Sequence, residues 1–308
     1  TFKQSLITLG KNQNESGQIP NAVDKFSKRK PHVDFASIDS SLWFVIGHYL
    51  YKKRYNDKSL FKKYKKNIDK TLMWLRCQDT GEKGMLTQLP TSDWQDAFPH
   101  KYGYTINTQA LYYNVLRLTG NKGAKRLKLM ANETKDTKLW DKNFYLPYRW
   151  KNHNKYLEIG SWFDSLGNLM AIVFELADKN RANKILNYIN KKKINVPYPV
   201  KTIYPPIRKG SKDWQDYYLD SDAGKPFHYL NGGIWTFIGA FYVLALIKLK
   251  KIKKAETELK SLAKANLDGD FAEWIHPYTK EHFGKLQSWN AGMYILAYES
   301  FVKKRVLL

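Results

Sequence analysis

Apolar residues recur along most of the chain at intervals of three and four, the spacing that gathers them on one side of an α-helix. Strict alternation of apolar and polar residues, which is typical of half-buried strands, is rare. The pattern therefore predicts a mostly helical protein, with helices at 2–13, 39–55, 57–78, 104–119, 121–133, 163–178, 180–191, 233–250, 252–266 and 288–304.

The predicted helices come in pairs of contrasting character. The first helix of a pair is apolar nearly all round and follows a loop rich in Trp, Asp, Tyr and Gly, as in "YGYTINTQALYYNVL" and "SWFDSLGNLMAIVF". The second is amphipathic and rich in lysine, as in "RANKILNYINKKK". Buried helices that alternate with exposed ones predict an all-α toroid, a double ring in which the polar loops gather at one end of the inner layer.

The sequence predicts a single domain over residues 1–308, because no low-complexity linker divides the chain. The segment 196–229 is rich in proline and poor in helix signals, and we expect it to form a large loop over the mouth of the ring, where long loops are usually functional. The apolar run "GGIWTFIGAFYVLALIKLKK" contains Thr and Tyr and ends in lysines, so we interpret it as a buried core helix rather than a membrane span.

The chain is strongly basic, with 52 Lys and Arg against 28 Asp and Glu and a net charge of +24. Such a charge attracts nucleic acid and anionic membranes, and a basic helical repeat protein that binds nucleic acid is one rival hypothesis. The lysine clusters at 62–66, 191–193 and 248–254 are spread along the whole chain, however. We interpret them as the solvated faces of amphipathic helices and expect neither a nucleic-acid nor a membrane partner.

Cysteine usage and the first residues bear on the compartment. Cys77 is the single cysteine, which excludes an internal disulfide and a cysteine-based zinc site. The opening "TFKQSLITLGKNQ" lacks the features of a secretory signal, so a cytoplasmic location is the expectation. His100, His276 and His282 lack the helical spacing of a zinc hydrolase, and we expect no metal and no other cofactor.

Acidic residues recur beside tryptophans in the loops that precede apolar helices. Asp93 and Asp96 lie in "SDWQD", and Glu273 lies in "FAEW". A single Asp before a helix is usually an N-cap, but two that are three residues apart cannot both cap one start. Inverting glycoside hydrolysis requires one carboxylic acid and one carboxylate about 6.5–9.5 Å apart, and aromatic rings and amides to hold the sugar. The loops contain these residue types.

The stretches "SDWQDAFPHKYGYTINTQALYYNVLR", "SWFDSLGNLMAIVFELAD", "HYLNGGIWTFIGAFYVLALIK" and "FAEWIHPYTKEHFGKLQSWNAGMYILAYE" resemble successive inner-helix motifs of (α/α)6-barrel glycoside hydrolases. The most similar groups are the glycogen-debranching amylo-α-1,6-glucosidase-like proteins and the neutral/alkaline invertases. The resemblance extends over about residues 5–300, in the order found in those proteins.

This resemblance assigns roles to particular residues. "DWQD" is similar to the family's "DWMD", which implies that Asp96 is the general acid, and "FAEW" is similar to "FPEWLHG", which implies that Glu273 is the general base. Asp164 in "WFDSLGN" is as well suited to accepting backbone hydrogen bonds as to touching substrate. The resemblance places these residues around the sugar: Asp39, Trp43, Asp93, Trp94, Gln109, His228, Asn231, Trp235, Gln287 and Trp289.

The sequence departs from the family pattern in two ways. Ala97 stands where "DWMDR" has arginine, and the predicted helices are two fewer than the twelve of a closed ring. The inner helix with an Arg-Asp pair, with which the relatives begin, is not found here. Either the prediction misses helices, the ring is open or completed by a second copy of the chain, or the sequence is part of a longer polypeptide. The function implied is an inverting hydrolase of α-glucosidic bonds in glucans or oligosaccharides. The alternatives are a sucrose-cleaving invertase and a carbohydrate-binding pseudoenzyme without turnover.

Overall fold

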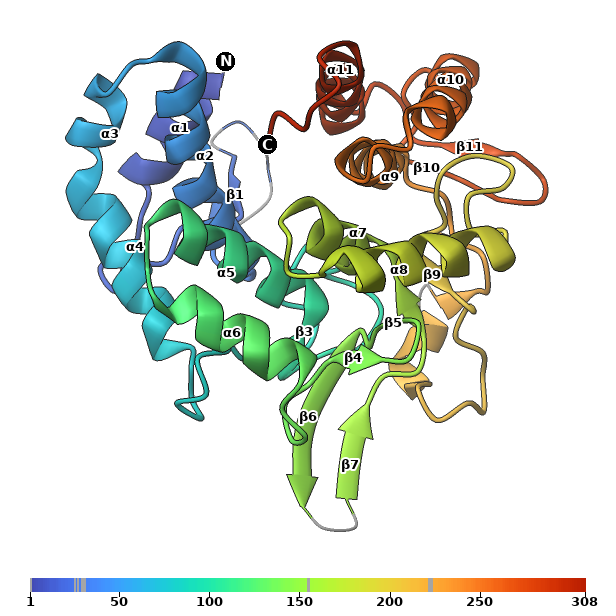
Figure 1. Ribbon diagram of the computed structural model, residues 1–308, viewed down its shortest axis with the longest axis horizontal. Coiled ribbons are helices and arrows are strands. Elements are labelled where there is room, and N and C mark those ends of the chain that lie inside the picture. Colours follow the sequence, from blue (N-terminus) through green and yellow to red (C-terminus); the bar gives the residue numbers. More distant parts are fainter. Residues whose placement is uncertain (1, 25, 27, 29–31, 154–155, 221–223) are drawn as a thin grey trace.

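A computed structural model describes the chain except for residues 1, 25, 27, 29–31, 154–155 and 221–223 (Figure 1). The described part is mostly helical. Its α-helices are α1 (Phe2–Lys11), α2 (Asp39–Tyr55), α3 (Ser59–Lys63), α4 (Lys65–Cys77), α5 (Ile106–Leu118), α6 (Gly123–Asn132), α7 (Ser165–Val173), α8 (Lys179–Lys191), α9 (Thr236–Lys248), α10 (Ile252–Asp268) and α11 (Ser288–Val302).

The apolar helices pack side by side in the order α2, α5, α7, α9 and α11 (Figure 1). Nearly every residue of α5, α7 and α9 is buried. A helix that is apolar on all sides must be covered on all sides, and each of these three has an apolar helix on either flank and an amphipathic helix against it. The predicted inner layer is thus present as a continuous series of helices.

The lysine-rich helices lie against this series, with α4 beside α2, α6 beside α5, α8 beside α7, and α10 beside both α9 and α11. In α8 the residues Ala182, Ile185 and Ile189 are buried, whereas Lys184 and Lys191 are exposed. The expected alternation of buried and solvated helices is confirmed, and it accounts for the position of much of the excess lysine.

The single helix expected over 57–78 is in fact two helices, because the chain leaves helical geometry at Tyr64. The ring of Tyr64 is buried beside His48 and Gly10. A Cβ at Gly10 would lie 2.6 Å from that ring, so the missing side chain of Gly10 leaves the space that Tyr64 fills. Burial of one aromatic side chain therefore interrupts a segment that local periodicity predicts to be continuous.

Short strands stiffen the loops that precede the apolar helices. The strands are β1 (Ala22–Val23), β2 (Val33–Asp34), β3 (Tyr104–Thr105), β4 (Trp140–Asp141), β5 (Phe144–Tyr145), β6 (Tyr148–His153), β7 (Tyr156–Ile159), β8 (Phe163–Asp164), β9 (Ile203–Tyr204), β10 (Trp274–Ile275) and β11 (His282–Phe283). All pairs are antiparallel, and the one three-stranded sheet among the described residues has the order β3-β6-β7. In the last hairpin Trp274 lies opposite Phe283.

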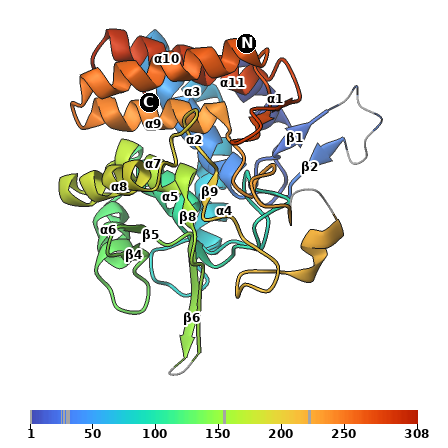
Figure 2. The ribbon, with the colours of Figure 1, turned by 90° about the vertical axis from the view of Figure 1, so that its right-hand side faces the viewer.

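The apolar run around residue 240 forms α9, which is 13 residues long and buried in the core, as expected. Across the described ranges, no helix combines the length and the apolar character needed to cross a bilayer. The long 196–229 segment contains β9 and a short 3-10 helix, Asp216–Asp220, drawn in gold away from the helical layers in Figure 2. Its Tyr218 packs on Phe98, and its hydroxyl accepts a hydrogen bond of 2.6 Å from the backbone of His100.

Candidate active site

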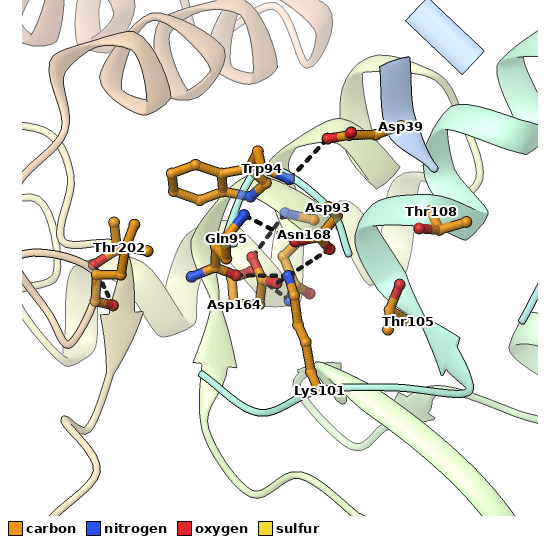
Figure 3. A network of polar contacts seen from close by, with 12 residues as sticks. Asp39, Asp93, Trp94, Gln95, Lys101, Thr105, Thr108, Asp164, Asn168 and Thr202 are labelled. Carbon is orange, nitrogen blue, oxygen red and sulfur yellow. Dashed lines mark hydrogen bonds and ion pairs between the residues drawn. The ribbon is translucent and has the colours of Figure 1, made fainter. Parts of the chain in front are cut away.

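A buried lysine fixes the loop that contains Asp93 and Asp96. Lys101 Nζ lies 3.0 Å from Asp93 Oδ2 and 3.0 Å from Asp164 Oδ2, and it donates to Gln95 Oε1 at 2.6 Å (Figure 3). Burial by itself lowers the pKa of Lys101, but the negative charges of Asp164 and Asp93 outweigh it and raise the pKa. The lysine therefore remains charged and ties the loop to the start of α7.

The two aspartates of "SDWQD" have different surroundings. Asp93 is 1% exposed; its Oδ1 accepts the backbone N–H of Gln95 at 2.9 Å, and its Oδ2 accepts Nε2 of Gln88 at 3.2 Å. These bonds and Lys101 occupy both carboxylate oxygens, so the expectation that Asp93 contacts substrate does not fit the structure. Asp96 is on the exposed side of the same turn.

Asp39, the first residue of α2, supports the same loop from the opposite side. Its Oδ2 accepts the backbone N–H of Trp94 at 2.9 Å (Figure 3). Burial and the nearby charge of Asp93 raise the pKa of Asp39 to about 6. One turn further along α2, Trp43 packs against Phe174 and Phe241, inside the series of apolar helices. Asp39 thus positions the indole of Trp94 through the backbone.

Asp96 is a carboxyl group with a raised pKa. Although its side chain reaches solvent, the surrounding loops remove part of its hydration, and this desolvation is the main reason that its pKa is raised. The charges of Asp93 and of Asp34 in β2 act in the same direction. An aspartic acid that retains its proton at higher pH is suited to donating that proton to a leaving group.

Glu273 lies immediately before β10, and its backbone N–H donates to Phe283 O at 2.8 Å. Desolvation raises the pKa of its carboxyl group; the hydroxyl of Tyr229, 3.5 Å from Oε1, lowers that pKa, and the charge of Asp96 raises it. Gly284 has φ +66°, and a Cβ there would lie 3.0 Å from Glu273 Cβ. The turn after β11 therefore needs glycine, and it fixes the position of the glutamate.

Tyr229 connects the two candidate catalytic carboxyl groups. Its pKa is raised to about 12, first by burial and then by the charges of Glu273 and Asp96. Because Asp96 also acts on Glu273, all three groups lie within range of one another's charge, although Asp96 is more than a hundred residues from the other two in the chain. The fold therefore brings together the two residues that the sequence proposes as acid and base.

Aromatic rings form a wall beside these carboxyl groups. The ring of Trp94 meets Trp235 at 5.7 Å and Phe237 at 5.2 Å, and Trp235 meets Tyr229 at 5.2 Å. The indole of Trp235 donates to Tyr229 O at 3.2 Å. The rings meet edge to face or tilted, an arrangement that holds each in place through packing. Apolar ring surface of this kind suits the C–H faces of a sugar.

Buried polar atoms beside this wall have no partner within the described part of the chain. They are Nε1 of Trp94, Nε2 of Gln95 and Oγ1 of Thr236, the first residue of α9. A buried polar group without a hydrogen bond is costly, so native proteins usually pair such groups with water or a ligand. Sugar hydroxyl groups both donate and accept, and they would satisfy all three.

Two residues expected to bind sugar instead hold the protein's own backbone. Gln109 is fully buried; its Nε2 donates to Leu86 O at 2.8 Å, and its Oε1 accepts Leu86 N at 3.1 Å. Asn231 is also fully buried, and its amide bonds Ile207 and Gly224. The hydrogen bonds of these two amides thus serve loop backbone, and a direct sugar contact from either one stays a prediction.

The other expected residues lie around the edge of the site. His228 packs 5.6 Å from the ring of Trp274, and Gln287 donates to Lys285 O at 3.2 Å, close to the turn at Gly284. Trp289, in the first turn of α11, is 45% exposed. Asp164 is the N-cap of α7, where its Oδ1 accepts the backbone N–H of Gly167 at 3.0 Å. It thus fills one of the two roles expected of it, that of accepting a backbone hydrogen bond.

Sequence reasoning missed Tyr229 and Lys101. Tyr229 lies in "HYLNGG" between the expected His228 and Asn231, but its orientation depends on a backbone φ of 40°, which a tyrosine adopts only when the surrounding fold imposes it. Lys101 is one of many lysines, and a lone lysine in a loop is normally solvated. The only signal for it was the nearby excess of carboxylates.

The chain is similar in sequence to known proteins. The family model for alkaline and neutral invertases matches residues 155–304, which include Tyr229, Trp235 and Glu273 but not Asp96. The chain is related to the alkaline and neutral invertases. A mitochondrial neutral/alkaline invertase of Oryza sativa subsp. japonica is 25% identical over 84% of this chain and 50% of that invertase. A probable chloroplastic alkaline/neutral invertase of Arabidopsis thaliana is 25% identical over 76% of this chain and 45% of its own length. The chain thus spans about half the length of these invertases.

Solved structures show a similar fold beyond the invertases. A GH63 mannosylglycerate hydrolase from Thermus thermophilus, in complex with glucose, has a TM-score of 0.71 at 12% identity and matches 97% of this chain and 88% of its own. A rhamnosidase from Klebsiella oxytoca with rhamnose bound has a TM-score of 0.61 at 14% identity, over 97% of this chain and 54% of its own. The fold of this chain is therefore similar to the folds of two proteins whose structures contain a bound sugar.

Proposed function

We propose that the chain is an inverting glycoside hydrolase that cleaves α-glucosidic bonds, with Asp96 as general acid and Glu273 as general base. The observation that supports this most directly is that the charge of Asp96 acts on Glu273 and on Tyr229, beside an aromatic wall with unpaired polar atoms. The relationship to proteins named invertases and the fold shared with a protein named mannosylglycerate hydrolase support the same class of reaction.

Asp96 protonates the oxygen of the leaving group in this mechanism. Desolvation raises its pKa, which keeps the proton on the side chain at a higher pH than in a fully hydrated aspartate. Asp39 and Lys101 hold the loop on either side, so that the carboxyl group and the Trp94 ring keep a fixed relation to each other. The sugar stacks on the indole while its glycosidic oxygen receives the proton.

Glu273 removes a proton from the attacking water. The charge of Asp96 raises the pKa of Glu273, so the glutamate ionises more readily once Asp96 carries its proton. The hydroxyl of Tyr229 favours the ionised glutamate by donating a hydrogen bond to it. A protonated Asp96 therefore favours an ionised Glu273, the combination that an inverting hydrolase requires.

The decisive experiment removes one carboxyl group at a time. The variants Asp96→Asn and Glu273→Gln should each lower kcat/KM by about 10²–10⁴, the usual contribution of a general acid or base. The matched control is Glu281→Gln, an exposed glutamate in the hairpin that follows Glu273. Unfolding curves must show all variants folded. Near-normal turnover by either active-site variant would refute the assignment, and sugar binding without hydrolysis by the wild type would favour the pseudoenzyme.

The substrate is to be resolved with a panel of sucrose, maltose, isomaltose, trehalose and a branched dextrin. Glucan or oligosaccharide cleavage is the first candidate, and sucrose is the second because the relatives are named invertases. Inversion of an α-glucoside releases β-glucose first, which proton NMR distinguishes from the α-anomer before mutarotation. Initial release of α-glucose from sucrose, or from the branch points of the dextrin, would contradict the inverting mechanism. Maltose, isomaltose and trehalose also release glucose as the leaving group, so they do not serve this stereochemical test.

We also infer that the paired helices belong to an (α/α)6 toroid, a double ring around the site. The ordered series from α2 to α11, with amphipathic helices against it, supports this arrangement. The helices α2 and α11 lie at opposite ends of that series (Figure 1), and α11 exposes Ile295 and Val302 on one side. Light scattering coupled to gel filtration will show whether a second copy covers this side. A crystal structure in which α2 and α11 diverge from a common ring would overturn the inference.

A further inference from the structure

A cavity lies outside the candidate active site. It has a volume of about 550 Å³ and is enclosed by the end of α4, the loop before α2, the 80–92 loop and the start of the β3-β6 pair. Volumes of about 300–1,000 Å³ are typical of small-molecule sites. The residues that line it include four aromatic residues and two glutamines, namely Phe35, Trp74, Tyr102, Trp150, Gln18 and Gln78. Neither Asp96 nor Glu273 is among them.

Aromatic rings supply much of the wall of this cavity. Phe35, Trp74, Tyr102 and Trp150 are all half-buried, so part of each ring is accessible. Tyr148 stacks on Tyr102 with ring centres 5.2 Å apart and thereby covers one face of that ring. The rings are therefore held in place and remain partly accessible.

Trp150 is seated on a glycine. A Cβ at Gly103 would lie 2.5 Å from Cε3 of Trp150, and φ at that glycine is +70°. Both facts require glycine at position 103 if the indole is to lie flat against the backbone. The indole is thus positioned by the chain before any ligand arrives, which reduces the entropy that binding would lose.

The polar groups of the cavity are all uncharged. Nε2 of Gln18 donates to Phe35 O at 2.7 Å, and Nε2 of Gln78 donates to Trp74 O at 3.1 Å. Within the described residues, Oε1 of each amide accepts no hydrogen bond, which leaves two oriented acceptors. In a chain with a net charge of +24, no lining residue is acidic or basic.

We infer that this cavity is a second carbohydrate-binding site, which takes one or two rings of a neutral oligosaccharide. An ionic ligand would find no countercharge, and a purely apolar ligand would leave the glutamine amides without partners. A neutral sugar places C–H faces on the rings of Trp74, Tyr102 and Trp150 while its hydroxyls donate to Gln18 and Gln78. This inference follows from the lining of the cavity and does not depend on hydrolysis at Asp96.

The cavity adjoins the loop of the candidate acid. Gln88, which lines the cavity, is buried; it accepts from Thr105 and Thr108 through Oε1 and donates to Asp93 through Nε2. Ser92, the last lining residue of that loop, precedes Asp93. A sugar bound here would lie against residues 88–92, which lead into the loop that carries Asp96, where it anchors an oligosaccharide beside the candidate active site.

The experiment uses the indole N–H signals of ¹⁵N-tryptophan-labelled protein with the Asp96→Asn substitution, which prevents consumption of the probe. Maltotriose and sucrose are the probes, and the Trp74 and Trp150 signals are assigned from Trp→Phe variants. Saturable shifts of both signals with one dissociation constant are the expected result. In Trp150→Ala the dissociation constant should rise at least tenfold, whereas the matched control Trp140→Ala, on β4, should bind as before.

The possible outcomes separate the two proposals. Shifts confined to Trp94 and Trp235, or none at Trp74 and Trp150 up to the solubility of maltotriose, overturn the second site without touching the catalytic assignment. Full turnover by Asp96→Asn overturns the catalytic assignment, and the titration is then repeated with Trp94→Ala, which disrupts the other wall. Equal affinity of Trp150→Ala and the parent also overturns the second site.

Discussion

Tyr229 has an effect on the candidate site that its neighbours in the sequence do not share. Its hydroxyl donates to Glu273 and lowers the pKa of that carboxyl group, against the larger effect of desolvation. Its main chain accepts the indole N–H of Trp235. One residue therefore links the base to the aromatic wall, and loss of its hydroxyl alone separates its electrostatic effect on Glu273 from the packing of its ring.

The variant Tyr229→Phe should shift the acidic limb of kcat/KM to higher pH. Without the hydroxyl, the pKa of Glu273 rises further, so the base becomes protonated earlier as the pH falls. The measurement is a pH profile of kcat/KM on the substrate found in the panel. Tyr278→Phe, an exposed tyrosine after β10, is the control and should leave the profile unchanged. An unaltered acidic limb in Tyr229→Phe would mean that the hydroxyl does not act on the base.

Asp39 provides a pH-dependent contribution to stability with a definite sign. Its pKa is raised from 3.8 to about 6, so the folded chain binds a proton that the unfolded chain has released between those values. Stability due to Asp39 is therefore greatest below pH 3.8 and falls as the pH rises to about 6. The ionised, buried carboxylate then destabilises the fold by up to about 3 kcal/mol.

Asp39→Asn removes this ionisation while its amide oxygen still accepts the Trp94 N–H. The variant should gain stability relative to the wild type between pH 4 and pH 6.5, because only the wild type is destabilised by ionisation of Asp39. The difference in free energy of unfolding should stay level above pH 6.5. Urea unfolding at a series of pH values measures it. A difference that is the same at all pH values would show that Asp39 titrates normally in the folded protein.

Among the structural elements, the acid loop and α7 are joined by a buried charge network rather than by apolar packing. Asp93 and Asp164 face Lys101 with all three side chains fully buried. Such a network adds little net stability, but removal of one partner leaves buried charge without compensation. The loop that carries Asp96 therefore depends on a residue that does not touch the site.

Lys101→Met should lower the free energy of unfolding by about 3–5 kcal/mol, because two carboxylates lose their shared countercharge. The matched control is Lys201→Met, since Lys201 is also buried but has its pKa lowered to about 8 by burial alone. Its loss should cost less. Urea unfolding measures both. If Lys101→Met does not fold, the triple variant Lys101→Met, Asp93→Asn and Asp164→Asn should recover stability, and equal failure of the triple variant would contradict the electrostatic account.

The molecule as a whole gathers its chemistry from loops that strands and buried polar groups hold together. The helices fix the distances between these loops, and the hairpin β10-β11 and the β8-β9 pair fix their orientation. The packing is uneven, because α11 buries Asn290, Ala297 and Ser300 on one side and exposes Ile295 and Val302 on the other. Stability should therefore depend on one side of this helix only.

Ile295→Gln and Val302→Gln should each change the free energy of unfolding by less than about 0.5 kcal/mol, as is usual for exposed positions. Ala297→Gln, close by on the same helix but fully buried, should destabilise by about 1–3 kcal/mol through overpacking. Chemical unfolding of dilute protein measures all three. A cost of about 2 kcal/mol or more for Ile295→Gln, well beyond the range for an exposed position, would show that this side is covered in solution.

Much of the helical architecture could be predicted from the chain alone, since apolar periodicity is a local property. The expected boundaries of α2 and α8 agree closely with the structure, and the error at Tyr64 arose from a side chain that a distant glycine accommodates. Most of the strands were missed because they are two residues long and carry no periodicity, and the pairs β3-β6 and β8-β9 join segments that are far apart in sequence.

The sequence by itself determined which segments are helical, which helices are buried, and which loops carry carboxylates and tryptophans, because residue type and spacing control local conformation and burial. Only the tertiary structure decided what each polar side chain contacts. Asp93, Gln109 and Asn231 bond loop backbone or Lys101, whereas Asp96 and Glu273 lie within range of each other's charge and of Tyr229. The physical reason is that a hydrogen bond or a charge interaction depends on distance and direction, which are set by packing among segments far apart in the chain.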